Sequence, residues 1–165
     1  SHGRLGKSRP EQESSNIPLL VRWPGEVPAG RVSEAIVGAV DFAPTLLGLL
    51  GLDVPRCMEG EDLSAAFLGR KRRGAEMAYL QYESTFFPQT PATVFRAVRR
   101  GRWMYSVFLT AGPAQLFDLQ ADPFQLRNLV GSAEHAAVRR ELEDALRRRA
   151  AELGDDFFIR LDARR

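Results

Sequence analysis

A histidine and a lysine stand close together in the polar stretch that opens the sequence. His2 and Lys7 are separated by four residues, with Arg4 between them, and residues 1–16 contain four serines and Pro10. An imidazole can donate a proton or a hydrogen bond, and an ammonium group is a compact charge that can hold an anion. We therefore expect residues 1–16 to be a loop that carries a site, although a lysine in such a loop is often simply solvated.

The other reactive side chains have simpler interpretations. Cys57 is the single cysteine, which excludes an internal disulfide and a multi-cysteine zinc site. It could act as a nucleophile, but neither His2 nor His135 is close to it in sequence, so a half-buried loop cysteine is the favoured interpretation. His135 is expected to be a surface residue. Three polar residues around a proline turn could surround a hard cation or, more commonly, cap backbone N–H groups: Asp118, Asp122 and Asn128.

The composition is that of an ordinary globular domain. The chain has 165 residues, 44% of them hydrophobic and 27% charged, and a formal net charge of +2. Its arginines cluster in three runs, at 70–73, 99–102 and 147–149. Such runs are usually solvated faces or turns, and no apolar run approaches the roughly 20 residues of a membrane span. We therefore expect neither nucleic acid nor a membrane as a partner.

Two strands and two helices are expected in the first part of the chain. Apolar runs cover 17–23, which ends at a Pro-Gly turn, and 35–40. Neither run alternates with polar residues, which is typical of strands covered on both faces in a mainly parallel sheet. A helix is expected over 41–51, capped by Asp41 at its start and Gly51 at its end, and a short helix over 63–68.

An antiparallel sheet and one long helix are expected in the second part. Strands are predicted over 76–82, 93–98, 103–108 and 115–119, the middle two joined as a hairpin by a basic turn around Gly101. Apolar residues at helical spacing predict a helix over 133–153 that ends at Gly154. Five apolar residues fall on alternate positions and are expected to form one covered face of the hairpin: Phe95, Ala97, Trp103, Tyr105 and Val107.

The predicted fold class is α/β, in two parts. Residues 1–70 supply strand–helix elements of a main sheet, and residues 71–165 form a subdomain with the antiparallel sheet and the long helix. The first part has two strands that need cover on both faces and only two short helices to provide it. We therefore expect the sequence to begin within a domain whose preceding elements are absent.

Three blocks of residues carry a resemblance to a known family. The first block contains His2-Gly3, Lys7, Pro10, Glu13-Ser14 and Ile17-Pro18-Leu19. The second contains Val40-Asp41-Phe42-Ala43-Pro44-Thr45-Leu46-Leu47, Leu50-Gly51 and Met58-Glu59-Gly60. The third contains Arg96-Ala97-Val98-Arg99, Gly101-Arg102-Trp103-Met104-Tyr105, Leu116-Phe117-Asp118-Leu119, Asp122-Pro123, Leu126 and Asn128-Leu129. In this order and spacing the blocks cover nearly the whole chain, and together they resemble the C-terminal portion of the type I sulfatases of the alkaline phosphatase superfamily.

The resemblance implies an activity and its cofactors. A full-length enzyme of this family is a sulfuric ester hydrolase that cleaves sulfate esters with a formylglycine nucleophile and a calcium ion. The motif that yields formylglycine and the Asp, Asn and His ligands of the metal would lie upstream of Ser1, since Cys57 does not match that motif. The chain alone is therefore expected to need a missing N-terminal catalytic core as its partner and to be inactive without it.

The resemblance also implies roles for three residues in this sequence. Lys7 matches the family's lysine that reaches the sulfate oxygens, His2 occupies a position near the sulfate or the bound ester, and Arg4 is expected at the mouth of the pocket. Lys7 and His2 would thus be catalytic, and all three would contact the substrate.

Two other functions stay open at this stage. One is a phosphonate or phosphate ester hydrolase of the same superfamily, because the same loop suits any tetrahedral anion. The other is a non-catalytic binding or assembly module that uses the arginine clusters. The sequence does not specify the ester that is cleaved, the oligomeric state or the cellular compartment.

Overall fold

The computed structural model of this chain describes residues 8–70, 74–83, 94–110 and 112–164. The chain divides into two compact units, one made of Ser1–Ile17 with Tyr79–Arg165 and the other of Pro18–Ala78. We call them the sheet unit and the helical unit, and each is described by itself. The expected division near residue 70 refers to a larger catalytic core and stays a prediction.

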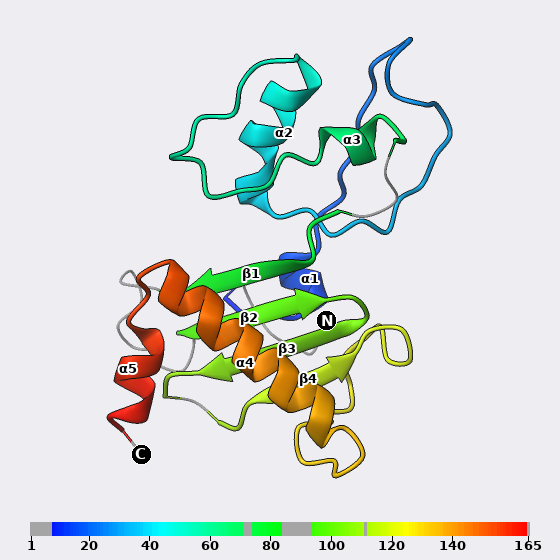
Figure 1. The fold of residues 1–165 in the computed structure, drawn as a ribbon. Helices are drawn as coiled ribbons and strands as arrows, with labels where there is room; N and C mark the ends of the chain where they lie inside the picture. The colour runs from blue at the N-terminus through cyan, green and yellow to red at the C-terminus, as the bar shows by residue number, and fades with distance from the viewer. Residues whose placement is uncertain (1–7, 71–73, 84–93, 111, 165) are drawn as a thin grey trace. The chain divides into compact units, whose positions relative to one another are not determined.

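A four-stranded antiparallel sheet organises the sheet unit (Figure 1). Its strands are β1 (Met77–Tyr82), β2 (Phe95–Arg100), β3 (Trp103–Phe108) and β4 (Gln115–Asp118), in the order β1-β2-β3-β4. Arg100 pairs with Trp103 across a two-residue turn, and Gly101 adopts the positive φ of 54° that this turn requires. The predicted strands and the hairpin of the second part are confirmed.

One long helix covers one face of this sheet. The helix α4 (Ala136–Glu152) buries an apolar stripe at helical spacing against β2 and β3: Leu142, Ala145, Leu146 and Ala150. Gly154, with a φ of 66°, takes the left-handed conformation that ends the helix. The predicted long helix and its stop are therefore confirmed.

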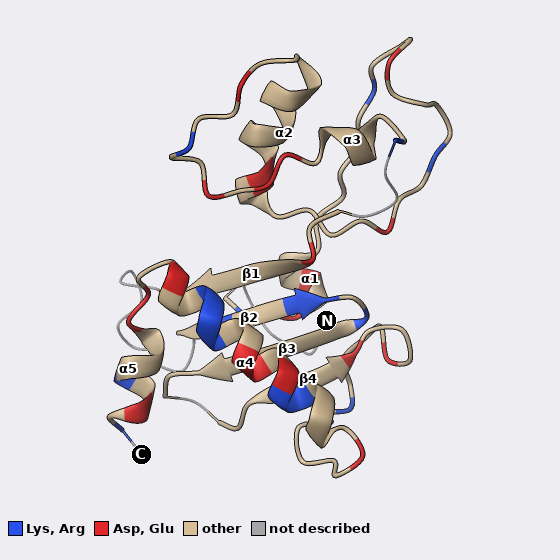
Figure 2. Ribbon diagram, viewed as in Figure 1, with Lys and Arg blue, Asp and Glu red and all other residues tan. Residues whose placement is uncertain are grey.

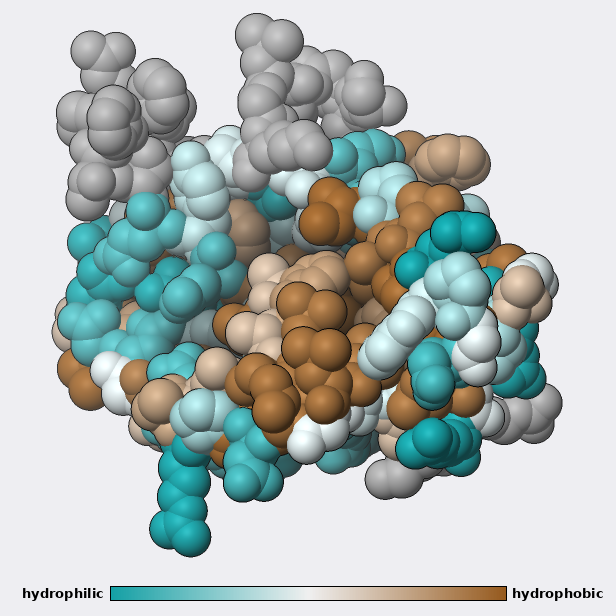
Figure 3. All heavy atoms as spheres, turned by 90° about the horizontal axis from the view of Figure 1, so that it is seen from above, coloured by the Kyte–Doolittle hydropathy of each residue, from teal (hydrophilic) through white to brown (hydrophobic). Residues whose placement is uncertain are grey.

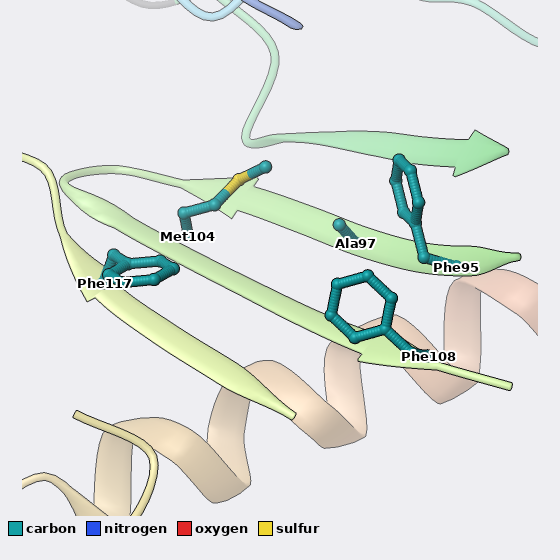
Figure 4. Packing of buried hydrophobic residues seen from close by; sticks show 5 residues of the cluster. All are labelled: Phe95, Ala97, Met104, Phe108 and Phe117. Atoms are coloured by element: carbon teal, nitrogen blue, oxygen red, sulfur yellow. The ribbon is translucent and has the colours of Figure 1, made fainter. Parts of the chain in front are cut away.

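The opposite face of the sheet holds its own apolar cluster (Figure 4). Five buried side chains rise from this face, on the side away from α4: Phe95, Ala97, Met104, Phe108 and Phe117. The prediction of a single covered face was wrong. The register pairs Phe95 with Phe108, so the alternation of the strands places Trp103, Tyr105 and Val107 on the face that α4 covers. Both faces of the hairpin are covered.

Two short helices of the sheet unit were not predicted. The helix α1 (Gln12–Ser15) is a single turn in the expected N-terminal loop. The helix α5 (Phe157–Asp162) follows α4 and buries Phe157, Phe158 and Leu161. Neither is long enough to show helical periodicity in the sequence, which explains why both were missed. Of the helices that the structure describes, none has the length and apolar character needed to cross a membrane.

The helical unit contains a 3₁₀ turn, η1 (Ala39–Asp41), followed by α2 (Phe42–Leu49) and α3 (Ser64–Phe67). The two predicted helices and the left-handed Gly51, with a φ of 68°, are confirmed. The predicted cap is wrong. The Asp41 carboxylate accepts the backbone N–H groups of Gly38 at 2.7 Å and Glu61 at 2.9 Å instead of those of α2, and it thereby ties two loops together.

The strands predicted over 17–23 and 35–40 do not form in this structure. Both segments are irregular apart from η1, which occupies the end of the second. A strand is stable only when its backbone N–H and C=O groups pair with a neighbouring strand, and these segments pair with none of the described strands. The apolar runs are real, but the described residues do not supply the neighbouring strands that these runs would need.

Candidate functional site

The three residues predicted to form the site, His2, Lys7 and Arg4, lie outside the described residues, which begin at Ser8. The structure bears on the site through the segment that directly follows Lys7. This segment, residues 8–16, belongs to the sheet unit. Its contacts define where the predicted site loop is fastened.

Residues 8–16 are fastened by burial and by local hydrogen bonds. Pro10 is fully buried, and Glu11 is 5% exposed. The Ser15 hydroxyl donates to the carbonyl oxygens of Pro10 and Glu11, at 3.0 and 3.1 Å, and so closes the turn of α1. The Arg9 guanidinium lies over the Phe108 ring, 5.3 Å from its centroid, a favourable cation–π distance. The segment therefore packs on the sheet face opposite α4, where Phe108 lies.

A glutamine from the loop between β4 and α4 completes this attachment. The Gln125 side chain is buried, and its Oε1 accepts the backbone N–H of Gln12 at 2.6 Å. Gln12 is the first residue of α1, where a backbone N–H has no partner within the helix. The contact joins positions 113 residues apart in the sequence. It links the segment after Lys7 to a loop of the C-terminal part of the chain.

The three polar residues that could have surrounded a cation instead accept backbone hydrogen bonds. Asp118 accepts two N–H groups of the turn that follows it, Asp122 accepts one, and Asn128 accepts two and donates one. In the part of the chain that the structure describes, no group of three or more His, Cys, Asp or Glu side chains is arranged to hold a metal ion. The capping interpretation of these residues is confirmed.

A cluster of charged and polar side chains around the buried Arg96 joins β1, β2 and the segment after α4. The Arg96 side chain is 4% exposed and donates to Asp155 from Nε at 2.5 Å and from Nη2 at 3.1 Å. The Tyr79 hydroxyl donates to the same carboxylate at 2.7 Å. Glu83 accepts from Arg96 at 3.0 Å and from Arg160 at 2.6 Å. Each charge in the cluster is thus paired with an opposite one.

The pKa values of this cluster suit a structural role. Burial alone would raise the pKa of the Asp155 carboxyl, but hydrogen bonds from Arg96 and Tyr79 outweigh it and leave that pKa below its usual value. Burial, reinforced by Asp155, raises the pKa of the Tyr79 phenol well above its usual value. A general acid or base working at neutral pH needs a pKa near neutrality, and both shifts lead away from it. The cluster holds strands together and is poorly suited to proton transfer.

Arginines of two of the basic runs are engaged in ion pairs, and acidic and basic residues alternate along the ribbon of the sheet unit (Figure 2). The pairs are Arg100 with Glu141, Arg102 with Asp118, Arg147 with Asp162, and Arg149 with Glu152. Pairing reduces the positive charge that such a surface would offer to phosphate groups. These contacts argue against the binding-module interpretation of those two runs.

Two other residues differ from expectation. Cys57 is exposed, whereas a half-buried position was expected. Most of the neighbouring loop residues are exposed too, so the loop does not cover the thiol. His135 is half-buried rather than a plain surface residue. Its ring packs edge-on against Trp103, with the ring centroids 5.5 Å apart, and its Nδ1 lies 2.9 Å from the Ser132 hydroxyl oxygen.

An apolar groove of about 310 Å³ opens on the helical unit. It is lined by residues of the predicted strand 17–23 together with residues of α2 and its neighbours: Leu19, Leu20, Val21, Arg22, Val37, Phe42, Thr45, Leu46, Leu49 and Phe67. Leu20 is 89% exposed, and a space-filling view shows apolar side chains gathered on the molecular surface (Figure 3). Apolar side chains gathered in this way commonly mark a contact surface.

The sequence interpretation missed Arg96 and Gln125 as structurally important residues. Arg96 stands between Phe95 and Ala97 in a strand, and it faces the side of the sheet that the helix covers. A charged residue at such a position needs a buried partner of opposite charge. That signal was readable in the alternation, but its partner, Asp155, lies far away in sequence. Gln125 gave no signal because its role depends on the shape of a loop.

Known proteins match this chain over most of its length. Residues 1–152 match the family described as N-sulphoglucosamine sulphohydrolase, C-terminal. An ulvan-active sulfatase of Formosa agariphila is 34% identical over 149 residues, which are 90% of this chain and 29% of that protein. A multifunctional alkaline phosphatase superfamily protein of Trinickia caryophylli is 31% identical over an alignment of 153 positions that covers 85% of this chain and 29% of that protein.

Solved structures match the fold as well. A protein in complex with its substrate D-glucosamine-2-N,6-O-disulfate superposes with a TM-score of 0.70 at 27% identity, over 82% of this chain and 28% of the other. The phosphonate monoester hydrolase of Agrobacterium radiobacter superposes with a TM-score of 0.54 at 25% identity, over 68% of this chain and 24% of the other. The chain spans less than a third of the length of each of these proteins.

Proposed function

Since this chain belongs to the family of N-sulphoglucosamine sulphohydrolase C-terminal domains, we propose that it is the C-terminal portion of a sulfatase that hydrolyses sulfate esters. The observation that carries the proposal is the family match over residues 1–152, which includes the opening segment with His2 and Lys7. The identity to an ulvan-active sulfatase over 90% of the chain supports it.

In the proposed enzyme Lys7 binds the sulfate group. Its ammonium would hold the sulfate oxygens in the ground state and stabilise the negative charge that develops as the S–O bond breaks. His2 would donate a hydrogen bond or a proton to the ester oxygen, and Arg4 would contact the substrate at the mouth of the pocket. The buried attachment of residues 9–15 to the sheet supports this role, because a catalytic charge must be held in a fixed place.

The nucleophile and the metal would come from outside this chain. Formylglycine and a calcium ion, which the family resemblance implies, would supply the attacking oxygen and the Lewis acid. The described residues offer no group suited to hold such an ion. We therefore propose that this chain has no hydrolase activity by itself and works with an N-terminal catalytic core.

The apolar groove of the helical unit is the surface we propose for this core. Leu20 and Val21 line the groove and are 89% and 42% exposed. Their segment, 17–23, has the apolar sequence of a buried strand but no strand partner among the described residues. A core that supplies a neighbouring strand would satisfy both the backbone and the side chains.

Substitution of Lys7 tests the proposal. In the complete protein that carries this chain, Lys7→Ala is expected to lower kcat/KM for an aryl sulfate by about 100- to 1000-fold, as the loss of one charge-stabilising donor does in other enzymes. Lys71→Ala, at the other lysine of the chain, is the matched control and should leave kcat/KM unchanged. A Lys7→Ala enzyme with activity close to that of the unmodified protein would show that Lys7 does not bind the sulfate.

A phosphonate monoester hydrolase is the second candidate. The structural match to the Agrobacterium radiobacter enzyme favours it specifically. A sulfate monoester and a phosphonate monoester both present oxygens on a tetrahedral centre, so Lys7 could serve either. Measuring kcat/KM for an aryl sulfate and an aryl phosphonate on the same enzyme preparation separates the two, since the larger value identifies the main activity.

A further inference from the structure

The loop between β4 and α4 holds one glutamine in an unusual conformation. Gln125 has a φ of 52°, the one positive value among the described non-glycine residues, and it is 3% exposed. Its neighbours Phe124 and Leu126 are 67% and 78% exposed. This loop turns two large apolar side chains outward and one amide inward. Non-glycine residues rarely adopt such a backbone conformation, so a specific contact must hold Gln125 in it.

The rest of the loop gives Gln125 a rigid frame. The Asp122 carboxylate accepts the N–H of Arg127 at 2.8 Å and so closes the loop across Gln125. Asn128 accepts the N–H of Leu116 in β4 at 3.0 Å and ties the end of the loop to the sheet. The Gln125 side chain therefore projects from a fixed point relative to the sheet.

The contact that Gln125 makes is with the start of α1. Its Oε1 accepts the N–H of Gln12 at 2.6 Å, five residues after Lys7. The intervening Pro10 is fully buried, and Arg9 stacks on Phe108. Because proline fixes its own φ, the described residues between Lys7 and α1 have less backbone freedom than a flexible linker would have.

Stability alone does not explain a glutamine at this position. The Gln125 Nε2 is buried and has no hydrogen-bond partner among the residues that the structure describes. A buried donor without an acceptor is unfavourable, so the amide brings a cost along with its one contact. The one hydrogen bond of the Gln125 side chain is made by its acceptor oxygen. This oxygen is directed at the backbone that leads into the predicted site loop.

We propose that Gln125 is a positioning residue of the sulfatase site: by holding the first N–H of α1, it fixes the point from which the loop with Lys7 departs. This inference rests on the proposed function of Lys7. Gln125 does not touch the substrate and acts through the backbone of residues 8–12. Its loss is expected to weaken both the binding of sulfate and the turnover of the ester.

The test removes the hydrogen bond from each side in turn, in the complete protein. Gln125→Met keeps the length of the side chain and removes the acceptor, whereas Gln125→Glu keeps an acceptor oxygen. Gln12→Pro removes the donor N–H at the first position of a helix, where proline is tolerated, and Glu11 has the extended φ and ψ of −57° and 153° that suit a residue before proline. The matched controls are Gln12→Ala and Gln120→Met, the latter at an exposed glutamine of the neighbouring turn.

Four measurements are compared across these variants: kcat/KM for an aryl sulfate, the inhibition constant of inorganic sulfate, hydrogen exchange of residues 9–16, and the thermal midpoint. Gln125→Met and Gln12→Pro are each expected to lower kcat/KM about tenfold or more and to weaken sulfate inhibition, with faster exchange over residues 9–16. Both controls should stay within about threefold of the unmodified enzyme, and Gln125→Glu should retain clearly more activity than Gln125→Met, because its carboxylate still accepts the N–H of Gln12 although it places a charge at a buried position. Because both changes break one hydrogen bond, the double variant should be little worse than either single variant.

The outcomes separate the inference from the proposed function. If Gln125→Met and Gln12→Pro exchange faster or melt lower but keep kcat/KM and the sulfate inhibition constant, Gln125 is only structural and the inference is overturned. The inference also fails if Gln125→Glu loses as much activity as Gln125→Met. If Lys7→Ala retains activity, the proposed function of Lys7 fails, whatever the glutamine variants show. If Gln125→Met does not fold, Gln12→Pro decides the question alone.

Discussion

At the scale of single residues, the structure separates side chains that hold the fold from those assigned to chemistry. Arg96 is charged and buried, yet its donors are used on Asp155 and Glu83. Its guanidinium also lies over the Phe157 ring, 4.9 Å from the centroid. A side chain engaged on all sides has no free donor for a substrate, so Arg96 is a structural residue. Gln125, by contrast, is directed at the backbone next to the predicted site.

Removing one partner of the buried ion pair should destabilise the sheet unit. Asp155→Asn removes the more buried of the two carboxylates that pair with Arg96 and leaves only Glu83, whose side chain is 42% exposed, so we expect a loss of about 3 kcal/mol in the free energy of unfolding, measured by urea denaturation. Asp156→Asn is the matched control. The Asp156 side chain is 64% exposed and pairs with Arg160 at the surface, so this change should cost less than about 1 kcal/mol. Equal losses in the two variants would contradict the assignment.

The same carboxylate predicts a dependence of stability on pH. The pKa of Asp155 is lower in the folded protein than in the unfolded chain, where an aspartate has a pKa of about 4. Its contribution to stability is therefore complete above that unfolded value and is lost as the pH falls through the lower, folded value. The stability difference between the unmodified protein and Asp155→Asn should be constant from about pH 7 to about pH 5 and shrink below about pH 4. Urea midpoints at several pH values measure it; a difference that does not shrink in acid would refute the linkage.

At the scale of elements, local sequence signals predicted the sheet unit well. The hairpin, β4 and α4 are marked by features that act within a few residues: a glycine turn, a proline turn, a helical apolar stripe and a stop glycine. The runs 17–23 and 35–40 were predicted as strands on equally strong apolar patterns and form none here. Strand formation depends on a neighbour that the pattern itself does not contain, whereas a helix forms its own hydrogen bonds.

The candidate site was predictable only in part for a related reason. His2, Lys7 and Arg4 come from a local pattern and a family resemblance, and they remain predictions. One contact that fastens the segment after them comes from Gln125, which is over a hundred residues away in the sequence and has a positive φ. No spacing rule links two such positions, because only the folded loop brings them together.

The packing of α4 on the sheet gives an element-scale prediction. Leu146 is fully buried, with 0% exposure, and its truncation in Leu146→Ala leaves a cavity in the interface between helix and sheet. We expect a loss of about 2–5 kcal/mol in the free energy of unfolding. Leu126→Ala is the matched control, since Leu126 is 78% exposed, and it should change stability by less than about 0.5 kcal/mol. Comparable losses at both leucines would mean that α4 does not bury its stripe as described.

At the scale of the whole molecule, the two units differ in how well each is covered. The sheet unit has apolar cores on both faces of its sheet and pairs many of its surface charges. In the helical unit large apolar side chains remain exposed, including Leu20, Leu46 and Leu50 at 89%, 57% and 64%. A surface of this kind favours either association between copies of the chain or burial against another protein surface. Our proposal assigns it to the catalytic core of the same enzyme.

A charge placed in the groove distinguishes these two possibilities. Leu20→Glu introduces a carboxylate at a groove-lining position, and Val32→Glu is the matched control, at a residue that is 98% exposed and outside the groove. In the 165-residue chain, Leu20→Glu should reduce self-association, measured by sedimentation velocity, because a carboxylate opposes the burial of this surface between two copies.

In the complete protein the same change would bury an unpaired charge against the core, so it should lower the thermal midpoint and the yield of active enzyme. Val32→Glu should do neither. If the complete protein tolerates Leu20→Glu as well as it tolerates Val32→Glu, the groove faces solvent in the enzyme and the core must attach elsewhere.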